Sequence, residues 1–243
     1  MVDSLTNPVA ESREDGRGPT ELRSTTLERN VLDYAEGSCL ISTGKTRILC
    51  AASVEDGVPP WLRGRGQGWV TAEYRMLPRA TQTRKAREST RGRLGGRTQE
   101  IQRLVGRSLR SVVDMQALGE RTVWIDCDVL QADGGTRTAS VTGAMVALYD
   151  ALKDDSVVPV REFVAATSVG VVGEFPVLDL CYGEDAAAEV DLNLVMTESD
   201  RVVEIQGTAE GEPFGLDVLD TLVQIGATGI KELIGLQKAT LGV

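Results

Sequence analysis

The sequence TVWIDCDVLQADGGTRTASVTGAMVALYDAL, residues 122 to 152, indicates a strand, a tight turn and a helix in succession. Its first nine residues are mostly β-branched or apolar, which is typical of a buried strand. Residues 138 to about 153 follow a helical pattern. Between them, residues 131 to 140 contain two glycines and then an arginine flanked by two threonines. This strand, turn and helix are the clearest local signal in the chain.

The turn between strand and helix has two interpretations. Gly134 and Gly135 allow a sharp turn and let main-chain N–H groups approach a ligand closely. The positive end of the helix dipole points at the same place, so that Thr136 and Arg137 could complete an anion-binding site. Alternatively, the turn is only structural: Thr138 or Ser140 caps the helix, and Arg137 lies in solvent. The turn alone leaves both interpretations open.

Positive charge is concentrated in one part of an otherwise acidic chain. The 243 residues carry a net charge of −10, yet residues 61 to 110 hold 13 of the 26 Lys and Arg and only 3 of the 36 Asp and Glu. All but one of these cations are arginine, whose planar fork of donors suits phosphate oxygens. Three acids cannot neutralise thirteen bases, so the segment predicts a polyanionic partner.

Composition excludes several classes of protein. The chain has no histidine, which rules out Ser-His-Asp triads, Cys-His pairs and most catalytic zinc sites. Four cysteines are scattered without CxxC spacing and are expected to be reduced and mostly buried. We find no apolar leader and no long apolar span. We therefore expect a cytoplasmic protein with no membrane partner, in which residues 1–12 form a disordered tail.

Hydrophobic periodicity predicts an α+β protein whose two halves resemble each other. In the first half we expect strands at 22–27, 38–42, 47–54 and 69–74, one long helix at 98–118, the strand at 122–130 and the helix at 138–153. In the second half we expect a hairpin at 164–172 and 175–180, two more strands, and a helix at 216–238. The similar order predicts a single domain at 13–243 with halves at about 13–155 and 156–243.

An acidic hairpin is expected in the second half. In residues 189–195 and 202–208, polar and apolar side chains alternate, which places them on opposite faces of a sheet. Symmetric closure would put Asp191 opposite Gln206 and Asn193 opposite Glu204. With Glu184 and Asp185 just upstream, the carboxylates suit Mg²⁺ or Mn²⁺, which prefer oxygen ligands. The alternative is the solvated face of an antiparallel sheet.

Taken in order along the chain, these segments resemble the ribonuclease PH family of phosphate-dependent 3′-to-5′ exoribonucleases, which trim tRNA precursors. The matching segments are REDGRGPTELR (13–23), AEGSCL (35–40), GQGWVTAEY (66–74), MLPRAT (76–81), GRTQEIQRLVGRSLR (96–110), ALGERT (117–122), DCDVLQADGGTRTASVTGA (126–144), EDAAAEVDLNLVMTE (184–198) and EIQGTAEGEPF (204–214). The resemblance implies a pseudo-duplicated βαβ fold like that of the second domain of ribosomal protein S5. It also implies assembly into a hexameric ring, a trimer of dimers.

The resemblance further implies roles for individual residues. Inorganic phosphate, the co-substrate, would be held by Arg97 together with Gly135, Thr136 and Arg137. Asp185 and Asp191 would bind the metal, Mg²⁺ or Mn²⁺, and take part in catalysis. RNA would be guided by arginines that reach a neighbouring subunit's site; these are Arg79, Arg84 and Arg87.

Three positions depart from the family pattern: Arg75, Ser24 and Gln82 stand where glycine, proline and histidine are usual. None of them lies in the phosphate or carboxylate motifs. Two alternatives to a phosphorolytic enzyme remain. One is a non-catalytic RNA-binding ring subunit of the exosome type, although such subunits typically lose one of these motifs. The other is a hydrolytic exonuclease that uses the same carboxylates.

Overall fold

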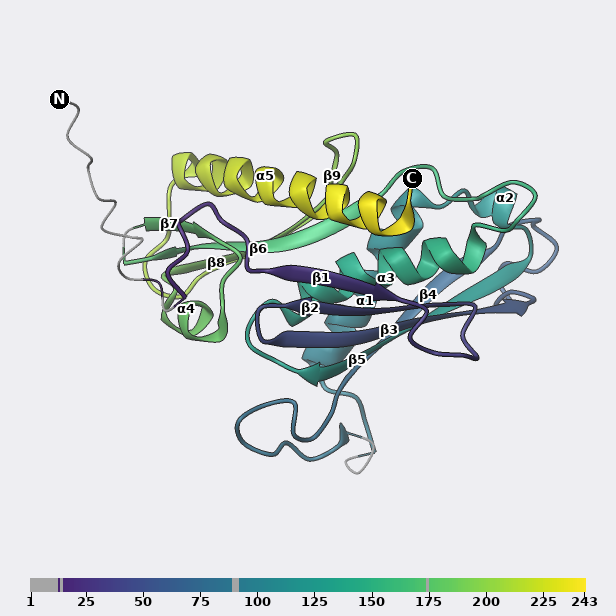
Figure 1. Cartoon of the computed structure of the whole chain (residues 1–243), viewed down its shortest axis with the longest axis horizontal. Helices are drawn as coiled ribbons and strands as arrows, with labels where there is room; N and C mark the ends of the chain where they lie inside the picture. Colours follow the sequence, from purple (N-terminus) through teal and green to yellow (C-terminus); the bar gives the residue numbers. More distant parts are fainter. Residues whose placement is uncertain (1–12, 14, 89–91, 174) are drawn as a thin grey trace.

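The computed structural model describes residues 13, 15–88, 92–173 and 175–243. The predicted tail at residues 1–12 lies outside the described residues. The elements in chain order are β1 (Thr25–Arg29), β2 (Gly37–Thr43), β3 (Thr46–Asp56), β4 (Trp69–Met76), α1 (Gly96–Val112), α2 (Met115–Leu118), β5 (Arg121–Gln131), α3 (Thr136–Leu152), β6 (Val164–Val172), β7 (Phe175–Leu178), α4 (Tyr182–Ala187), β8 (Val190–Thr197), β9 (Val202–Ala209) and α5 (Leu216–Leu241). The predicted α+β class is confirmed (Figure 1).

Residues 25–131 form one sheet, and residues 164–209 form a second. The first sheet has the strand order β1-β2-β3-β5-β4, and the second has the order β7-β6-β8-β9. In the first sheet β4 and β5 are parallel and α1 connects them, which makes a βαβ unit. The second sheet is antiparallel throughout. One continuous hydrophobic core includes side chains from both sheets.

Helix α3 lies between the two sheets (Figure 1). Most of its side chains are buried, because it packs against β2 and β3 on one side and β6 on the other. Gly143 makes this close packing possible, since a Cβ there would lie 2.7 Å from Ile41 Cγ2 and 3.0 Å from Cys50 Sγ. The buried Gln237 of α5 donates to the carbonyls of Thr142 and Val164 and so joins α5 to α3 and β6. The GGTRT turn at the start of α3 is therefore carried by the most buried helix of the described chain.

The single long helix predicted at 98–118 is wrong. Helix α1 ends at Val112, and Val113 is extended and bridges to Val160. Asp114 then starts the short helix α2, because its Oδ1 accepts from the N–H groups of Gln116 and Ala117 at 3.0 and 3.1 Å. An aspartate that caps a new helix competes with continuation of the old one, and apolar periodicity does not reveal this.

The predicted pairing of the acidic hairpin is shifted by two residues, although its faces are correct. Asp191 lies opposite Thr208, and Asn193 lies opposite Gln206. A three-residue turn follows Thr197, and the main-chain N–H of Thr197 donates to the carbonyl of Arg201 across it. A bulge lies between Val195 and Met196. Because side chains alternate with period two, a shift of two keeps every side chain on its predicted face.

Two predicted strands have different bounds. The strand predicted at 22–27 is β1, which begins at residue 25, because the main-chain N–H of Arg23 donates to Asp179 Oδ2 at 2.8 Å instead of joining the sheet. The strand predicted at 175–180 ends at Leu178, because Asp179 adopts a left-handed conformation with φ of 54°. Both differences arise at one contact between Arg23 and Asp179.

All four cysteines are free, as predicted: three are buried and Cys181 is half-buried. Burial raises the pKa of Cys39 to about 12, so this thiol is protonated at neutral pH. No helix within the described residues is long and apolar enough to cross a membrane.

Candidate active site

Two helix N-termini with the same local sequence plan form the centre of the site. Helix α1 follows Gly95, and helix α3 follows Gly135, which is left-handed with φ of 64°. No side chain caps either helix. Arg97 and Arg137 each occupy the second residue of their helix. Each helix therefore has free main-chain N–H groups and an arginine at its N-terminus, where an anion can bind.

The structural alternative for the GGTRT turn is wrong, because neither proposed residue caps α3. Thr138 Oγ1 donates to the carbonyl of Gly135 at 2.9 Å, and Ser140 Oγ donates to the carbonyl of Thr136 at 2.8 Å. Both hydroxyls therefore stabilise carbonyl groups and leave the N-terminal N–H groups of α3 without a side-chain acceptor. The helix also begins at Thr136, two residues earlier than predicted.

Arg137 is not in solvent. Its side chain is 13% exposed, and it donates to Gln206 Oε1 of β9 and pairs with Glu100 of α1 at 3.4 Å. Gln206 also donates to Glu100, so the three side chains form one hydrogen-bonded group. Arg137 is thus held in place by residues from two other elements.

Thr136 is buried and is hydrogen-bonded by a residue to which our sequence analysis assigned no role. The hydroxyl of Tyr74, on β4, lies 2.9 Å from Thr136 Oγ1. Burial raises the pKa of Tyr74, while the positive charges of Arg97 and Arg137 act in the opposite direction. Both arginines are therefore close to Tyr74, although they lie 40 residues apart in the sequence. The GQGWVTAEY motif contains Tyr74, but no local pattern links it to Thr136.

Asp185 and Asp191, the two predicted metal ligands, lie on consecutive elements of the chain. Asp191 lies on β8, and Asp185 is exposed on α4, a six-residue helix that our sequence analysis did not predict. Burial, and then repulsion from Asp185, raise the pKa of Asp191, while Arg137 and Arg97 lower it. The electrostatic influence of all three residues on Asp191 indicates that the four charged groups lie near one another, and we call the place where they meet the pocket.

Asp191 also has an unsatisfied acceptor. Its Oδ1 is buried and has no hydrogen-bond partner among the described residues. A buried carboxylate oxygen without a partner is costly, and such groups are often completed by a ligand or an ion. The solvated-sheet alternative holds for only part of the acidic face: Glu189 and Thr208 are exposed, whereas Asn193 is buried and Gln206 bonds Arg137. The polar face of β8 and β9 is turned toward α1 and α3.

The carboxylates fit an open magnesium site better than a closed one. Within the described part of the chain, no group of three or more His, Cys, Asp or Glu side chains could hold a metal ion. Mg²⁺, however, usually takes only one or two carboxylates and completes its shell with water and substrate phosphate. Asp185 and Asp191 match that smaller ligand set.

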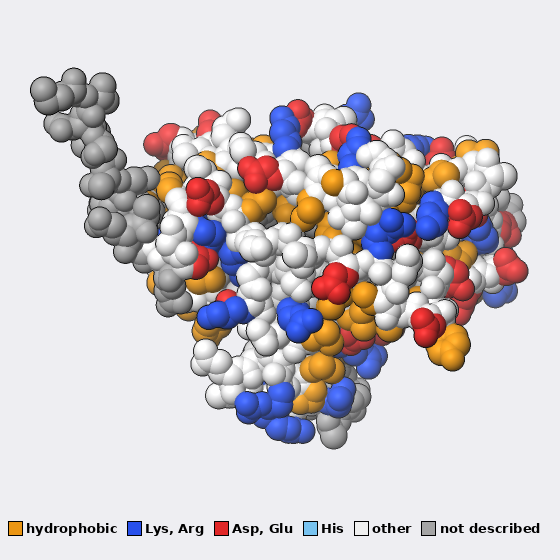
Figure 2. Space-filling view, viewed as in Figure 1, with side chains coloured by type: hydrophobic (Ala, Val, Ile, Leu, Met, Phe, Trp, Pro, Cys, Tyr) orange, Lys and Arg blue, Asp and Glu red, His pale blue; other side chains and the backbone are white. Residues whose placement is uncertain are grey.

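The three arginines predicted to guide RNA are Arg79, Arg84 and Arg87. All three are exposed on the loop between β4 and α1, which projects from the molecule (Figure 1) and carries a group of basic side chains (Figure 2). The base of this loop is anchored beside the GGTRT turn, because the N–H of Ala132 donates to the carbonyl of Ala80 at 2.8 Å. Arg79 is the neighbour of this anchor point.

Comparison with known proteins identifies the family of the chain. The model of domain 1 of the 3′ exoribonuclease family matches residues 21–154, and the model of domain 2 matches residues 162–229. The chain therefore belongs to the 3′ exoribonuclease family. It is 57% identical over 236 residues to ribonuclease PH of Moorella thermoacetica, covering 95% of this chain and 94% of that protein.

Solved structures share the fold. Rice (Oryza sativa) Rrp46 superposes with a TM-score of 0.79 at 20% identity, covering 95% of this chain and all of that one. A chain of the Archaeoglobus fulgidus exosome with RNA bound to the active site superposes with a TM-score of 0.77 at 25% identity, covering 91% of both chains. The recognition of the family from sequence motifs is confirmed.

Proposed function

We propose that the pocket between α1, α3 and α4 binds inorganic phosphate and directs it at the 3′ end of an RNA chain. The chain is a phosphorolytic 3′-to-5′ exoribonuclease of the ribonuclease PH type, a tRNA nucleotidyltransferase that trims the 3′ end of tRNA precursors and releases nucleoside 5′-diphosphates. One observation carries the assignment of the pocket. Two uncapped helix N-termini each bear an arginine whose charge acts on Asp191, and this aspartate has a buried oxygen without a partner in the described chain.

The proposed role of the arginines is to bring two anions together. Main-chain N–H groups at Gly135 and Thr136, with Arg97 and Arg137, hold phosphate and offset its repulsion from the RNA backbone. An oxygen of this phosphate attacks the phosphorus of the last phosphodiester, and the bond to the 3′ oxygen of the preceding nucleotide breaks. The products are a nucleoside diphosphate and an RNA shortened by one nucleotide. Because phosphate is itself the nucleophile, the reaction requires no histidine.

The proposed role of the carboxylates is to hold Mg²⁺, or Mn²⁺, and to manage a proton. A bound divalent ion would neutralise charge that develops on the phosphate oxygens. One of the two aspartates would give a proton to the departing 3′ oxygen. Burial and the nearby charge of Asp185 raise the pKa of Asp191. Asp185 is exposed and can reach a cation shared with substrate.

The substrate is RNA, and members of this family form rings. For this chain we propose a hexamer built as a trimer of dimers and acting in the cytoplasm. In it, the exposed Arg79, Arg84 and Arg87 would contact RNA that is bound in a neighbouring subunit's pocket. Their position on a projecting loop supports this assignment (Figure 1).

Product analysis tests the reaction class. The purified protein is incubated with a 3′-extended tRNA precursor and Mg²⁺, with and without inorganic phosphate. We expect nucleoside diphosphates only when phosphate is present. Nucleoside monophosphates in phosphate-free buffer would identify a hydrolase, and no release of nucleotides under either condition would identify a non-catalytic ring subunit.

A further inference from the structure

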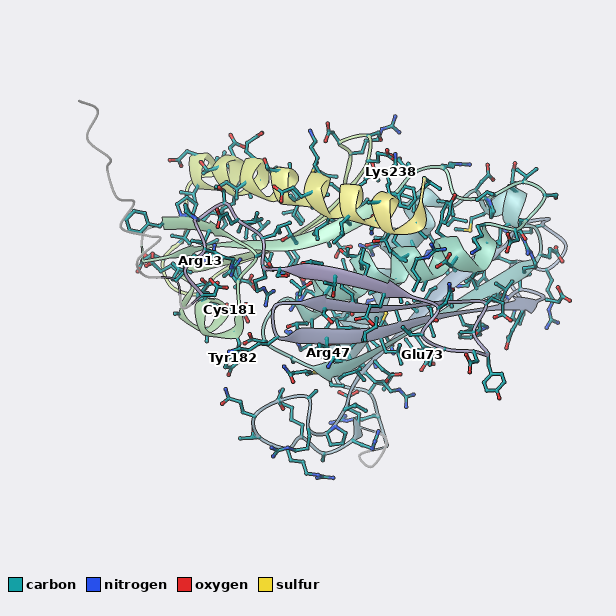
Figure 3. The ribbon with its side chains drawn as sticks, viewed as in Figure 1. Arg13, Arg47, Glu73, Cys181, Tyr182 and Lys238 are labelled. Carbon is teal, nitrogen blue, oxygen red and sulfur yellow. The ribbon has the colours of Figure 1, made fainter. Side chains whose placement is uncertain are left out.

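The motif REDGRGPTELR, residues 13–23, is not part of the phosphate pocket, yet it is tied to it by buried charge. Five charged side chains, each at most 9% exposed, form a network that we call the N-terminal clamp: Arg13, Arg17, Arg23, Asp179 and Glu184. Figure 3 shows Arg13 near Cys181 and Tyr182, which begin the region of α4. At the exposed edge of the clamp, Asp15 pairs with Arg17 at 2.7 Å.

One arm of the clamp contacts the phosphate turn. Arg23 forms a two-pronged pair with Asp179, through Nε at 3.0 Å and Nη2 at 2.7 Å. Its remaining nitrogen, Nη1, donates to the carbonyl of Asp133 at 2.6 Å, directly before the two glycines. A Cβ at Gly135 would lie 2.8 Å from Arg23 Nη2. Arg23 therefore packs against the back of the turn that presents Thr136 and Arg137.

The other arm holds the helix that carries Asp185. Arg13 donates from Nε and Nη2 to the two carboxylate oxygens of Glu184, at 2.7 and 3.1 Å. Glu184 in turn accepts from the N–H of Cys181 at 2.9 Å and so completes the capping box that starts α4. Asp185 is the next residue. Arg13 thus sets the position of the first turn of α4.

The two arms are joined. Arg17 lies 3.8 Å from Asp179 and 3.6 Å from Glu184, and it also donates to the carbonyl of Asp179. The turn and the α4 region touch at Gly134, where a Cβ would lie 2.6 Å from the carbonyl oxygen of Leu180 and 2.8 Å from the nitrogen of Tyr182. Because there is no space between them, a shift of the turn must move the start of α4.

Stability alone is a weak explanation for such a network. Burying five charges carries a desolvation cost that packed apolar side chains would avoid, whereas two-pronged arginine pairs give defined geometry. We propose that Arg13, Arg23, Asp179 and Glu184 are positioning residues that set the phosphate-binding turn relative to Asp185. This inference rests on the phosphate site proposed above.

Arg23→Lys is the primary test, since it keeps the charge and removes the fork. We expect the KM for phosphate to rise about tenfold, because a small misplacement of a binding group is costly. The KM for RNA should stay within a factor of about two, because no RNA-contacting residue changes. Inorganic phosphate binding, measured by titration calorimetry on the assembled protein without RNA, should weaken in parallel.

The matched control is Arg29→Lys. Arg29 also forms a two-pronged pair with a buried carboxylate, that of Asp150, but this pair joins β1 to α3 at the end away from the turn. We expect it to lower the melting temperature without changing the KM for phosphate. If Arg23→Lys changes the KM for phosphate no more than Arg29→Lys does, the clamp is merely structural and the inference is wrong.

Two further variants separate the possible failures. Asp179→Asn keeps the side-chain shape and replaces Arg23→Lys as the test if the lysine variant does not assemble. We expect the same rise in the KM for phosphate. An unchanged KM for phosphate in Asp179→Asn would also overturn the inference. Arg137→Ala tests the phosphate site itself. A raised KM in Arg137→Ala with a normal one in Arg23→Lys rejects only the clamp, whereas normal values in both reject the phosphate site as well.

Discussion

The starts of helices α1 and α3 are built on the same plan but are held very differently. Each follows a glycine without a side-chain cap, and each carries an arginine at its second residue. Arg97 is exposed and has no hydrogen-bond partner among the residues that the structure describes. Arg137 is held by Gln206 and Glu100, and the turn before it rests on Arg23.

This difference indicates two kinds of anion-binding group. Arg137 is already oriented, so little side-chain entropy is lost when phosphate binds, whereas Arg97 must be ordered by the ligand. In the proposed site, the start of α3 would therefore bind phosphate with a preoriented arginine, and the start of α1 with an arginine that becomes ordered on binding. The four experiments below test this contrast, in order of decreasing expected effect.

Arg137→Ala should have the largest effect. Loss of a preoriented charge beside the phosphate should cost about 3 kcal/mol, a hundredfold or more in kcat/KM. Steady-state phosphorolysis of a 3′-extended RNA measures it. Arg107→Ala is the control, because Arg107 of α1 forms an exposed ion pair with Glu204 of the same β9 strand that holds Arg137. Unchanged phosphorolysis in Arg137→Ala would overturn the role of this arginine.

Replacement by lysine compares the two arginines directly. Arg137→Lys should lower kcat/KM for phosphate about tenfold, since lysine cannot reproduce a fork that bonds neighbours and ligand together. Arg97→Lys should lower it only about threefold, because no internal hydrogen bond is lost. The ratio of the two losses at saturating RNA is the measured quantity. Equal losses would show that the internal partners of Arg137 do not matter.

Tyr74→Phe should have a smaller effect. It removes the hydroxyl that bonds Thr136 and leaves the ring, so about 1 kcal/mol or a fivefold rise in the KM for phosphate is expected. The KM for RNA should not change. Tyr149→Phe is a suitable control, because Tyr149 packs its ring against Phe163 away from the pocket. An equal rise of the KM for phosphate in both variants would show that Tyr74 has no specific role in phosphate binding.

Asp191→Asn should show the smallest effect in a stability measurement. Burial and Asp185 raise the pKa of Asp191, so the folded protein binds its proton more tightly than the unfolded chain does. Stability is therefore lost as pH rises from about 4 through the raised pKa. At neutral pH without Mg²⁺, the asparagine variant should melt higher by about 2 °C, and the gain should vanish near pH 4.

The same melting temperatures are then measured with added Mg²⁺. An ion that binds the folded state stabilises it, so Mg²⁺ should raise the melting temperature of the natural protein more than that of Asp191→Asn. Equal shifts in the two proteins would place the cation elsewhere.

Much of this protein follows from local sequence. The strand, turn and helix of residues 122 to 152 and the faces of the acidic hairpin could be predicted, because backbone preference and side-chain period depend on neighbours a few residues apart. The family could be predicted from the resemblance of its sequence motifs. The break after Val112 and the two-residue shift of the hairpin could not, because a cap at Asp114 and a bulge after Val195 each outweigh periodicity.

The arrangement of the site was decided only by tertiary structure. The family resemblance assigned Arg97 and Arg137 to one phosphate and Asp191 to the metal, but it is the packing of α1, α3 and the second sheet that brings these side chains together. The pair of Arg13 and Glu184 spans 171 residues, and that of Arg23 and Asp179 spans 156. Contacts over such separations leave no local period in the sequence, because they form only when the buried core brings distant segments together.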